Sequence, residues 1–394
     1  MKRFRFLDRV SSVMVSEFTL GVEEEYQLVD AGTGALRSRA RHVLAADWSG
    51  EIRKELQETT VEVGTAVCRS AAELERELKR LRLQAATAAA VEGLEIVAAG
   101  THPFSRWEGQ KRTAGPRYDR LEAEYGRIAR DEHNFGMHIH VAVPSERDRI
   151  RILNVARCYL PQLLALSCSS PYYEGEDTGY ASYRMILWRR WPVGGIPPRL
   201  ESQEEYGRLA DLLLQTGAVG DLRSIYWGLR PHSVYPTLEF RVTDACPRVE
   251  DAVAIAALAR ALVFAAAEGL VAEERCAGFS ASVQDSLLGD NLWRAARWGL
   301  DACLVDPGSE TGATPMRASL RGLIDRLIGP AEALGDAEAF GHLETLLERG
   351  TAADRMRQVY RERQGFRPLV KWLVEETLAG TGMERWHMPR EACA

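Results

Sequence analysis

Cysteine is sparse and unpaired in this sequence. The chain has 394 residues and seven cysteines, and none of the cysteines forms a Cys-x-x-Cys pair. An odd count without paired spacing indicates neither a disulfide framework nor a thiolate zinc cluster. The composition is therefore typical of a reduced, cytoplasmic protein.

Long apolar runs and an excess of basic residues are also absent. No stretch approaches the ~20 apolar residues that a membrane-spanning helix needs, so no membrane association is expected. The net charge of -6 argues against nucleic acid as a partner, because a surface that follows phosphates carries a basic excess. The sequence shows neither an internal repeat nor a low-complexity segment. Small molecules are the expected partners.

The N-terminus lacks the apolar core of a signal peptide. Basic residues occur early, but Asp8 and Arg9 interrupt any apolar run before it reaches the required length. We predict that residues 1–17 are an N-terminal extension. Residues 18–394 are predicted to form a single domain that is α+β to about residue 282 and helical over 283–394.

Two common glycine-rich phosphate-binding motifs are missing as well. The sequence contains neither a Gly-x-x-x-x-Gly-Lys loop nor a Gly-x-Gly-x-x-Gly turn. If a nucleotide binds to this chain, metal ions and arginines must hold its phosphates instead.

What the sequence does contain is a set of alternating segments. Apolar and polar residues alternate over 18–29, 135–143 and 234–243, which is the period of a β-strand. Strands are also predicted over 58–63 and 94–100, and helices over 70–93, 119–131, 147–168 and 250–274. Strands buried on both faces would read as continuous apolar runs, whereas these have one polar face. The pattern therefore predicts an antiparallel α+β fold with helices covering the apolar face of the sheet.

The polar faces of these strands carry Glu, His and Arg rather than a mixture of neutral polar residues. Glu23 and Glu25 lie two residues apart on a strand, so their Cβ atoms are roughly 7 Å apart on one face. Carboxylates that close repel each other unless a cation lies between them, and Mg²⁺ prefers such oxygen ligands. The alternative is a solvated strand edge.

Three more glutamates lie around the second strand. Glu58 and Glu62 would share a face of an unbroken strand, while Glu55 and Glu62 would lie on opposite faces. Glu55 can still reach a site from the turn that precedes the strand. Spacing alone favours surface positions for all three.

His138 and His140 share one face of the 135–143 strand. A His-x-His pair can bind a metal ion or contact a phosphate, and it is the main support for a rival hypothesis, a zinc-dependent hydrolase. A structural pair of histidines is the other alternative. On the 234–243 strand, Glu239 and Arg241 likewise share a face. The carboxylate could bind a metal ion while the guanidinium binds phosphate or a substrate carboxylate, or the residues could form a cross-strand ion pair.

Four collinear motifs resemble the glutamate–cysteine ligase type 2 (carboxylate–amine ligase) family. FTLGVEEEYQLVD resembles its opening strand, GMHIHVAV its histidine strand, and SPYYEGEDTGYASYR its Tyr/Arg loop. TLEFRVTDACPRVEDAVAIAALARAL is similar to its later Glu-x-Arg strand and the helix that follows. The motifs span roughly residues 18–265, and their combination is more specific than any one of them.

The resemblance implies a glutamine-synthetase-like catalytic fold, with an antiparallel sheet curved into a trough and ATP and divalent metal ions on its polar face. It also implies a reaction. A substrate carboxylate, the γ-carboxylate of glutamate in the type reaction, attacks the γ-phosphorus of ATP, and an amine then displaces phosphate from the acyl phosphate. Positioning and charge neutralisation provide most of the catalysis in such chemistry.

The resemblance also implies roles for individual residues. Arg241 and Arg184 match arginines that bind phosphate or the substrate carboxylate and act in catalysis, and His140 and Tyr180 lie in motifs that bind substrate or ATP. The residues that match metal ligands, for Mg²⁺ or Mn²⁺ as a substitute, are Glu23, Glu25, Glu55, Glu62, His138 and Glu239.

The leading hypothesis is thus an ATP-dependent carboxylate–amine ligase, which would join L-glutamate to L-cysteine in the type reaction. The zinc hydrolase is one alternative, and a catalytically idle family member that acts as a binding protein is another. A homodimer is compatible with a metabolic enzyme of this size.

Overall fold

The computed structural model describes residues 17–273 and 279–383. The predicted extension at 1–17 lies almost entirely outside the described residues. Within them, no helix combines the length and the apolar composition that a membrane crossing requires.

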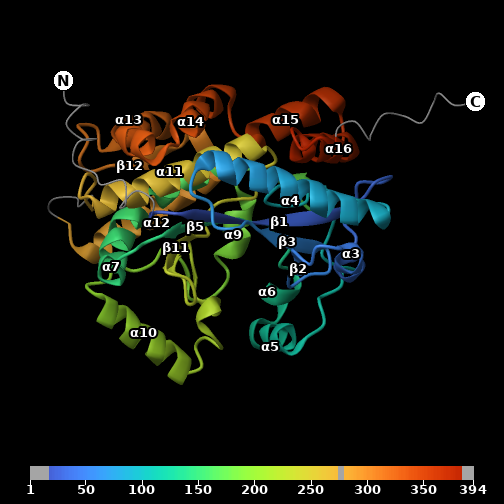
Figure 1. Cartoon of the computed structure of the whole chain (residues 1–394), viewed down its shortest axis with the longest axis horizontal. Coiled ribbons are helices and arrows are strands. Elements are labelled where there is room, and N and C mark those ends of the chain that lie inside the picture. Colours follow the sequence, from blue (N-terminus) through green and yellow to red (C-terminus); the bar gives the residue numbers. More distant parts are fainter. Residues whose placement is uncertain (1–16, 274–278, 384–394) are drawn as a thin grey trace, which may run out of the picture.

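A seven-stranded sheet forms the centre of the fold (Figure 1). Every pairing within this sheet is antiparallel, as the alternation of the strands predicts. Its order is β10 (Leu229–Pro231), β11 (Thr237–Phe240), β5 (Met137–Ala142), β1 (Leu20–Asp30), β3 (Thr60–Gly64) and β2 (Ile52–Lys54), and β4 (Leu94–Val97) also pairs with β1.

Helices cover the apolar face of the sheet and extend beyond it. In Figure 1, α4, α11 and α13 to α16 lie above β1 and β3, whereas α5, α6 and α10 lie below. The helices are α3 (Ala40–Ala46), α4 (Ala71–Val91), α5 (Pro116–Tyr125), α6 (Arg127–Arg130), α7 (Glu146–Ala156), α8 (Leu160–Ser167), α9 (Tyr183–Trp188), α10 (Gln203–Gln215), α11 (Val249–Ala267), α12 (Ala281–Trp298), α13 (Met316–Leu334), α14 (Ala337–Arg349), α15 (Ala352–Arg363) and α16 (Phe366–Leu378).

Two of these helices hold the core together. Helix α4 begins after Ser70, whose side chain accepts a hydrogen bond from the Glu73 amide at 3.2 Å, as the sequence predicts. Helix α11 is buried along nearly its whole length, because its alanine-rich sequence is apolar on all sides. It packs against α4 and the sheet on one side and against α13 and α14 on the other.

Several predicted elements differ from the structure. The helix predicted over 147–168 is divided into α7, a 3₁₀ turn at Arg157–Tyr159, and α8, with Pro161 in the first turn of α8. The segment predicted as all helix after residue 283 contains a two-stranded hairpin, β12 (Cys303–Val305) with β13 (Ala313–Pro315). Strands β2 and β10 and helix α3 were not predicted, because each is short, and the 13-residue amphipathic helix α10 was missed although Ser202 caps it.

A buried ion pair fastens the sheet to the helices. Glu24 lies on the apolar face of β1, and Arg82 of α4 donates to both of its carboxylate oxygens, at 2.5 and 2.9 Å. Both side chains are fully buried. Arg82 also donates to the backbone carbonyl oxygens of Cys246, Pro247 and Thr377, so one guanidinium links β1, the start of α11 and α16.

We predict that Arg82→Met lowers the free energy of unfolding by about 3–5 kcal/mol, because it leaves the Glu24 charge buried without a cation, with only the Tyr26 hydroxyl among the side chains shown to donate to it. Equilibrium unfolding in denaturant measures the change. The matched control is Arg37→Met, which removes a pair with Asp30 at the surface and should cost less than about 1 kcal/mol. Equal losses in the two variants would contradict the proposed importance of the Glu24–Arg82 pair. Adding Glu24→Gln to Arg82→Met should restore part of the loss.

Candidate functional site

The polar face of the sheet forms one wall of a cavity of about 380 Å³. Strands β1, β3, β5, β10 and β11 contribute to it, together with the α5 to α6 region and helix α9. The predicted site residues that line this cavity are Glu23, Glu25, Glu55, Glu62, His138, Arg184, Glu239 and Arg241.

The antiparallel register explains why these residues meet. Glu23 of β1 is opposite His138 of β5, Glu25 of β1 is opposite Glu62 of β3, and His140 of β5 is opposite Glu239 of β11. Opposite residues on antiparallel strands project to the same face. Side chains far apart in the sequence are therefore brought together by strand pairing.

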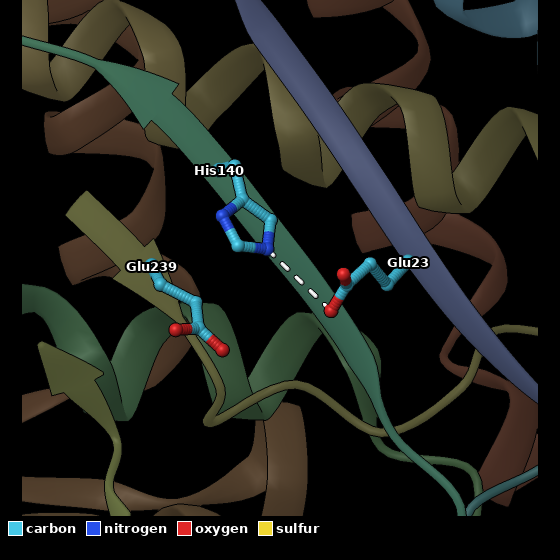
Figure 2. A group of neighbouring side chains, drawn as sticks. All are labelled: Glu23, His140 and Glu239. Carbon is cyan, nitrogen blue, oxygen red and sulfur yellow. Dashed lines mark ion pairs between the residues drawn. The ribbon is translucent and has the colours of Figure 1, made fainter. Parts of the chain in front are cut away.

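Acidic and histidine side chains of this face form three overlapping groups whose ligand atoms lie within 4.8 Å of one another. One group is Glu23, His140 and Glu239, which extend toward one another from three strands (Figure 2). The other two are Glu23, Glu62 and His138, and Glu25, Glu55 and Glu62. All six residues that the family resemblance suggests as metal ligands occur in these groups.

Glu23 is paired with the two histidines. Its Oε2 lies 3.4 Å from His138 Nδ1 and 3.5 Å from His140 Nε2. Burial acts to raise the pKa of Glu23, but the interactions with His138 and His140 outweigh burial and hold the pKa far below its usual range. Burial and the nearby Arg241 lower the pKa of His138 to about 4. The pair thus offers an ionised carboxylate beside a neutral imidazole, and both are competent metal ligands.

Glu25, Glu55 and Glu62 form a carboxylate cluster with little compensating charge. Burial and the neighbouring Glu55 raise the pKa of Glu25 to about 7. Burial, with the other glutamates, also raises the pKa of Glu62 well above its usual range, and burial raises that of Glu55. The ion-pair partner of Glu62 is the half-exposed Arg53, 4.0 Å away, and Arg184 and Arg241 offset the rise in the pKa of Glu25 only in part. A divalent cation bound by oxygen ligands would relieve this repulsion, so these residues fit Mg²⁺.

Glu239 has a second set of partners. Arg230 of β10 donates to both oxygens of Glu239, at 2.7 and 3.2 Å, and Arg241 donates to Oε1 at 2.5 Å. Burial acts to raise the pKa of Glu239, but the two guanidinium groups hold it far below its usual range. The cross-strand ion pair that the sequence left open is present, with Arg230 as the cross-strand partner. Glu239 therefore orients two arginines as well as lying within reach of a metal ion.

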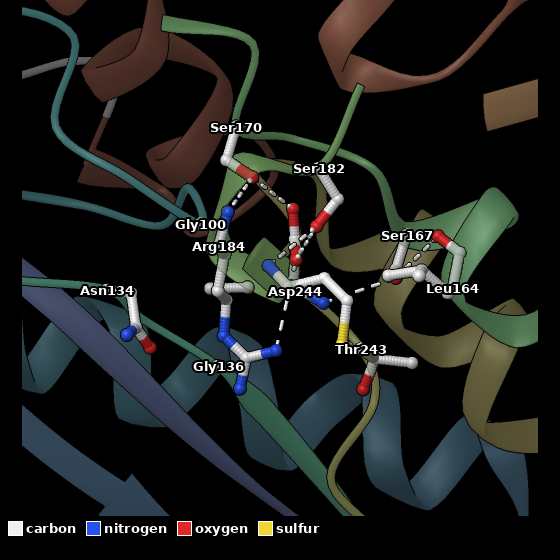
Figure 3. Close-up of polar contacts among 12 residues, drawn as sticks. Gly100, Asn134, Gly136, Leu164, Ser167, Ser170, Ser182, Arg184, Thr243 and Asp244 are labelled. Atoms are coloured by element: carbon white, nitrogen blue, oxygen red, sulfur yellow. Dashed lines mark hydrogen bonds and ion pairs between the residues drawn. The ribbon is translucent and has the colours of Figure 1, made fainter. Parts of the chain in front are cut away.

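Arg184 is a buried cation with unused hydrogen-bond donors. Its Nη2 donates to the Arg241 carbonyl oxygen at 3.3 Å, and its Nη1 lies 3.8 Å from Asp244 Oδ1. Among the described residues, Nε and Nη1 have no hydrogen-bond partner. Asp244 is itself fixed by the hydroxyl groups of Ser170 and Ser182, at 2.7 and 2.8 Å (Figure 3). This network holds the guanidinium at the cavity with donors available for an anion.

Gly136 makes room for Arg184. A Cβ atom at this position would lie 2.3 Å from Arg184 Nη2, so any larger residue would displace the guanidinium. The Gly136 amide also donates to Glu25 Oε2 at 2.5 Å. The glycine that begins the histidine strand thus allows Arg184 and Glu25 to approach the same point.

Two predicted binding residues, Tyr180 and His140, do not line this cavity. Tyr180 does not line the cavity; its ring packs against Arg297 and Tyr183, and its carbonyl oxygen accepts a hydrogen bond from Arg357. The loop between β7 (Glu176–Asp177) and α9 turns Tyr180 toward the helical part of the chain, and its contact with substrate or ATP stays a prediction. His140 lies at the neighbouring cavity, which is mostly apolar and is also bordered by Glu23 and Tyr235.

Several residues of the cavity were missed in the sequence. Arg230, Glu132, Asn134, Trp188 and Trp191 all line it. Arg230 lies on a strand of three residues, which is too short to show alternation. Glu132 and Asn134 precede the histidine strand in a segment without periodicity, and the two tryptophans read as core residues.

The histidine geometry does not favour zinc. Within the described part of the chain, His138 and His140 fall in different groups of candidate ligands, and none of the three groups contains two histidines or a cysteine. Zinc sites in hydrolases combine two or three such ligands at one point.

The known proteins that this chain resembles indicate a single family. Residues 19–372 match the glutamate–cysteine ligase family 2. A protein of Roseiflexus sp. (strain RS-1), provisionally named glutamate–cysteine ligase 2, is 40% identical over 368 residues, which cover 92% of this chain and 95% of that protein. A protein of Chloroflexus aurantiacus (strain ATCC 29366 / DSM 635 / J-10-fl) with the same provisional name is 39% identical over 92% of this chain and 93% of its own.

Two solved structures share the fold. The glutamate–cysteine ligase of Francisella tularensis, in complex with AMP, has a TM-score of 0.65 at 13% identity, over 92% of this chain and 89% of that one. A bifunctional glutathione synthetase of Pasteurella multocida has a TM-score of 0.66 at 16% identity over 95% of this chain, which spans 54% of that protein. The predicted α+β, glutamine-synthetase-like fold is thereby confirmed. With the family match extending over most of its length, the chain belongs to the glutamate–cysteine ligase family 2.

Proposed function

We propose that this chain is an ATP-dependent carboxylate–amine ligase. The reaction that its family suggests joins L-glutamate and L-cysteine, with ATP, to give γ-glutamylcysteine, ADP and phosphate through an acyl phosphate. The observation that carries the proposal is the combination, in one cavity, of a buried carboxylate cluster with arginines that have open donors. The AMP in the Francisella tularensis glutamate–cysteine ligase supports a nucleotide site in this fold.

The carboxylate cluster is the part of the cavity suited to the nucleotide phosphates. Glu23, Glu25, Glu55, Glu62 and His138 would hold Mg²⁺, with Glu239 in reach. Bound there, Mg²⁺ would neutralise the phosphate charge that these carboxylates otherwise repel. Mn²⁺, with similar ligand preferences, would serve as a substitute.

The arginines are the part suited to the anionic substrate. Arg184 presents Nε and Nη1 without partners, and a planar guanidinium binds a carboxylate or phosphate through two parallel hydrogen bonds. Arg241 is held by Glu239 and leaves its own Nε open among the described residues. Together they would position the carboxylate for attack on the γ-phosphorus and stabilise the charge that moves onto oxygen.

We expect the purified protein to release phosphate and ADP only when Mg²⁺, ATP, a carboxylate and an amine are all present. A phosphate-release assay with L-glutamate, and with pools of amino acids and amines, measures this. Glu23→Gln should abolish the release, because Glu23 belongs to two of the three ligand groups. Protein that binds no Mg–nucleotide would contradict the proposal. Hydrolysis without ATP would favour the zinc enzyme, and a Glu23→Gln variant with unchanged behaviour would favour an idle binding protein.

Two glutamates close together in the sequence, Glu62 of β3 and Glu58 just before it, provide a test of the proposed metal site. Glu62→Gln should weaken Mn²⁺ binding, measured by electron paramagnetic resonance in the presence of ATP, by about 10-fold or more. Glu58→Gln is the control, since Glu58 lies near the same strand, its side chain accepts a hydrogen bond from the Arg41 amide, and it does not line the cavity. If the two variants bind Mn²⁺ equally well, Glu62 is not a ligand.

For Arg184, we predict that Arg184→Gln lowers kcat/KM for the carboxylate substrate by about 10- to 100-fold, which corresponds to about 1.5–3 kcal/mol for hydrogen bonds to a charged group. Steady-state kinetics at saturating ATP and amine gives the value. Arg189→Gln provides the control, because Arg189 is exposed at the end of the same helix. A loss confined to the affinity for ATP would assign Arg184 to the phosphates instead.

A further inference from the structure

Glu132 also lines the cavity, and it belongs neither to the carboxylate cluster nor to the anion-binding arginines described above. It lies in the segment between α6 and β5, and its side chain is 13% exposed. Asn134 Nδ2 donates to its Oε1 at 2.5 Å. Its Oε2 is buried and accepts no hydrogen bond from any residue within 17–273 or 279–383. Glu132 therefore lines the cavity and has a buried oxygen that no hydrogen-bond donor satisfies.

The nearest arginine forms an ion pair with this oxygen but donates no hydrogen bond to it. Arg190 is held by Asp131, with Nη1 donating to Oδ2 at 3.0 Å and Nη2 lying 2.9 Å from Oδ1. From Glu132 Oε2, Arg190 Nη2 is 3.7 Å away. Burial raises the pKa of Glu132 to about 7, although interactions with the side chains of Trp191 and Asn134 act to lower this pKa. A carboxyl group in this environment can both hold and release a proton near neutral pH.

Glu132 also lies in the electrostatic field of Arg184, the open anion-binding group of the cavity. Figure 3 shows Asn134, which donates to Glu132, in the same region as Gly136 and the Arg184 guanidinium. An open acceptor and an open donor thus line one cavity. That pairing is complementary to two reactants that meet there, one an anion and the other a cation.

Two buried tryptophans form another part of the cavity wall. Trp188 and Trp191 are 4% and 5% exposed and both line the cavity. The ring of Trp191 is held between Tyr125 and Tyr226, with ring centroids 5.0 and 4.9 Å away. The space that these rings fill would be closed to water, which competes with an amine for an acyl phosphate.

We infer that Glu132 binds the ammonium group of the amine substrate and accepts the proton that the amine must lose. This inference rests on the proposed ligase function. An ammonium ion has no lone pair, so transfer of one proton to the Glu132 carboxylate gives a neutral amine and a carboxylic acid. The amine nitrogen then forms the C–N bond to the acyl carbon while the C–O bond to phosphate breaks. The phosphate leaves with that electron pair and takes the second amine proton.

Hydroxylamine separates this role from the others, because it is uncharged at neutral pH and needs no base before it attacks. The assay uses L-glutamate, ATP and Mg²⁺ with either L-cysteine or hydroxylamine, and measures phosphate and the coloured iron complex of the hydroxamate. Glu132→Gln should lower the rate with L-cysteine by about 100-fold or more, while the rate with hydroxylamine stays within about threefold of the unmodified protein. Glu132→Asp, which keeps a withdrawn carboxylate, should give an intermediate rate with L-cysteine.

The control is Glu124→Gln, an exposed glutamate on α5 outside the cavity, which should change neither rate. Thermal unfolding checks that each variant is folded. If Glu132→Gln loses both rates, Glu132 serves formation of the acyl phosphate or binding of the carboxylate substrate, and the inference is overturned. If Glu132→Gln loses neither rate, or Glu132→Asp matches Glu132→Gln, the inference is likewise overturned. An unmodified protein that forms neither product overturns the proposed function itself, and that result is distinguishable from the others.

Discussion

The site depends on one electrostatic constraint, which is the repulsion among carboxylates held close together on a rigid sheet. Glu25, Glu55 and Glu62 have ligand atoms within 4.8 Å of one another, and burial with mutual repulsion raises their pKa values. Such an arrangement is unfavourable for the free protein, and each carboxylate added to it strengthens the attraction for a divalent cation. Packing on the apolar face of the same sheet offsets the stability that is lost at this polar face. There, helices α4 and α11 bury the opposite side of β1, and the Glu24–Arg82 pair fixes the strand to three separate parts of the chain.

Strand β1 shows how one sequence serves both faces. Glu23, Glu24 and Glu25 are consecutive, yet they have three different environments. Glu23 meets two histidines, Glu24 meets a buried arginine, and Glu25 meets other carboxylates. Because side chains of a strand alternate between faces, a shift of one residue in register would exchange the metal-facing carboxylates for the one that holds the core. The register of β1 with β3 and β5 is thus required by function and by stability together.

How much of this could be predicted from the sequence differs from feature to feature. Alternation located the strands and the face of Glu23, Glu25, His138, Glu239 and Arg241, because a period of two is a local property. The family resemblance, rather than spacing, singled out Glu55 and Glu62. Tyr180 lies outside the cavity, and its direction could not be read from the sequence because a loop residue has no periodicity that fixes it. Arg230 and Glu132 could not be found, since one lies on a strand of three residues and the other in an irregular segment. Glu24 carried a signal, as a charged residue between Val22 and Tyr26 on an apolar face requires a buried partner.

The division of the cavity into unlike parts explains how one site can accept reactants of opposite charge. The carboxylate cluster would repel any anion until a cation is bound, so in the proposed function the phosphates and the metal ion would depend on each other at that end. In the proposed function, Arg184 would attract the substrate carboxylate, because Asp244 holds its charge in place and its Nε and Nη1 have no hydrogen-bond partner among the described residues. Glu132 supplies the opposite charge at the wall formed by the tryptophans, where a cationic amine would be favoured over a second anion. In the proposed function, residues of this chain would therefore determine where each charged reactant is neutralised: Arg184 for the substrate carboxylate and Glu132 for the amine. A nucleophile reaches the acyl carbon only as a neutral amine, and Glu132 is placed to make it neutral inside the cavity and not in the solvent.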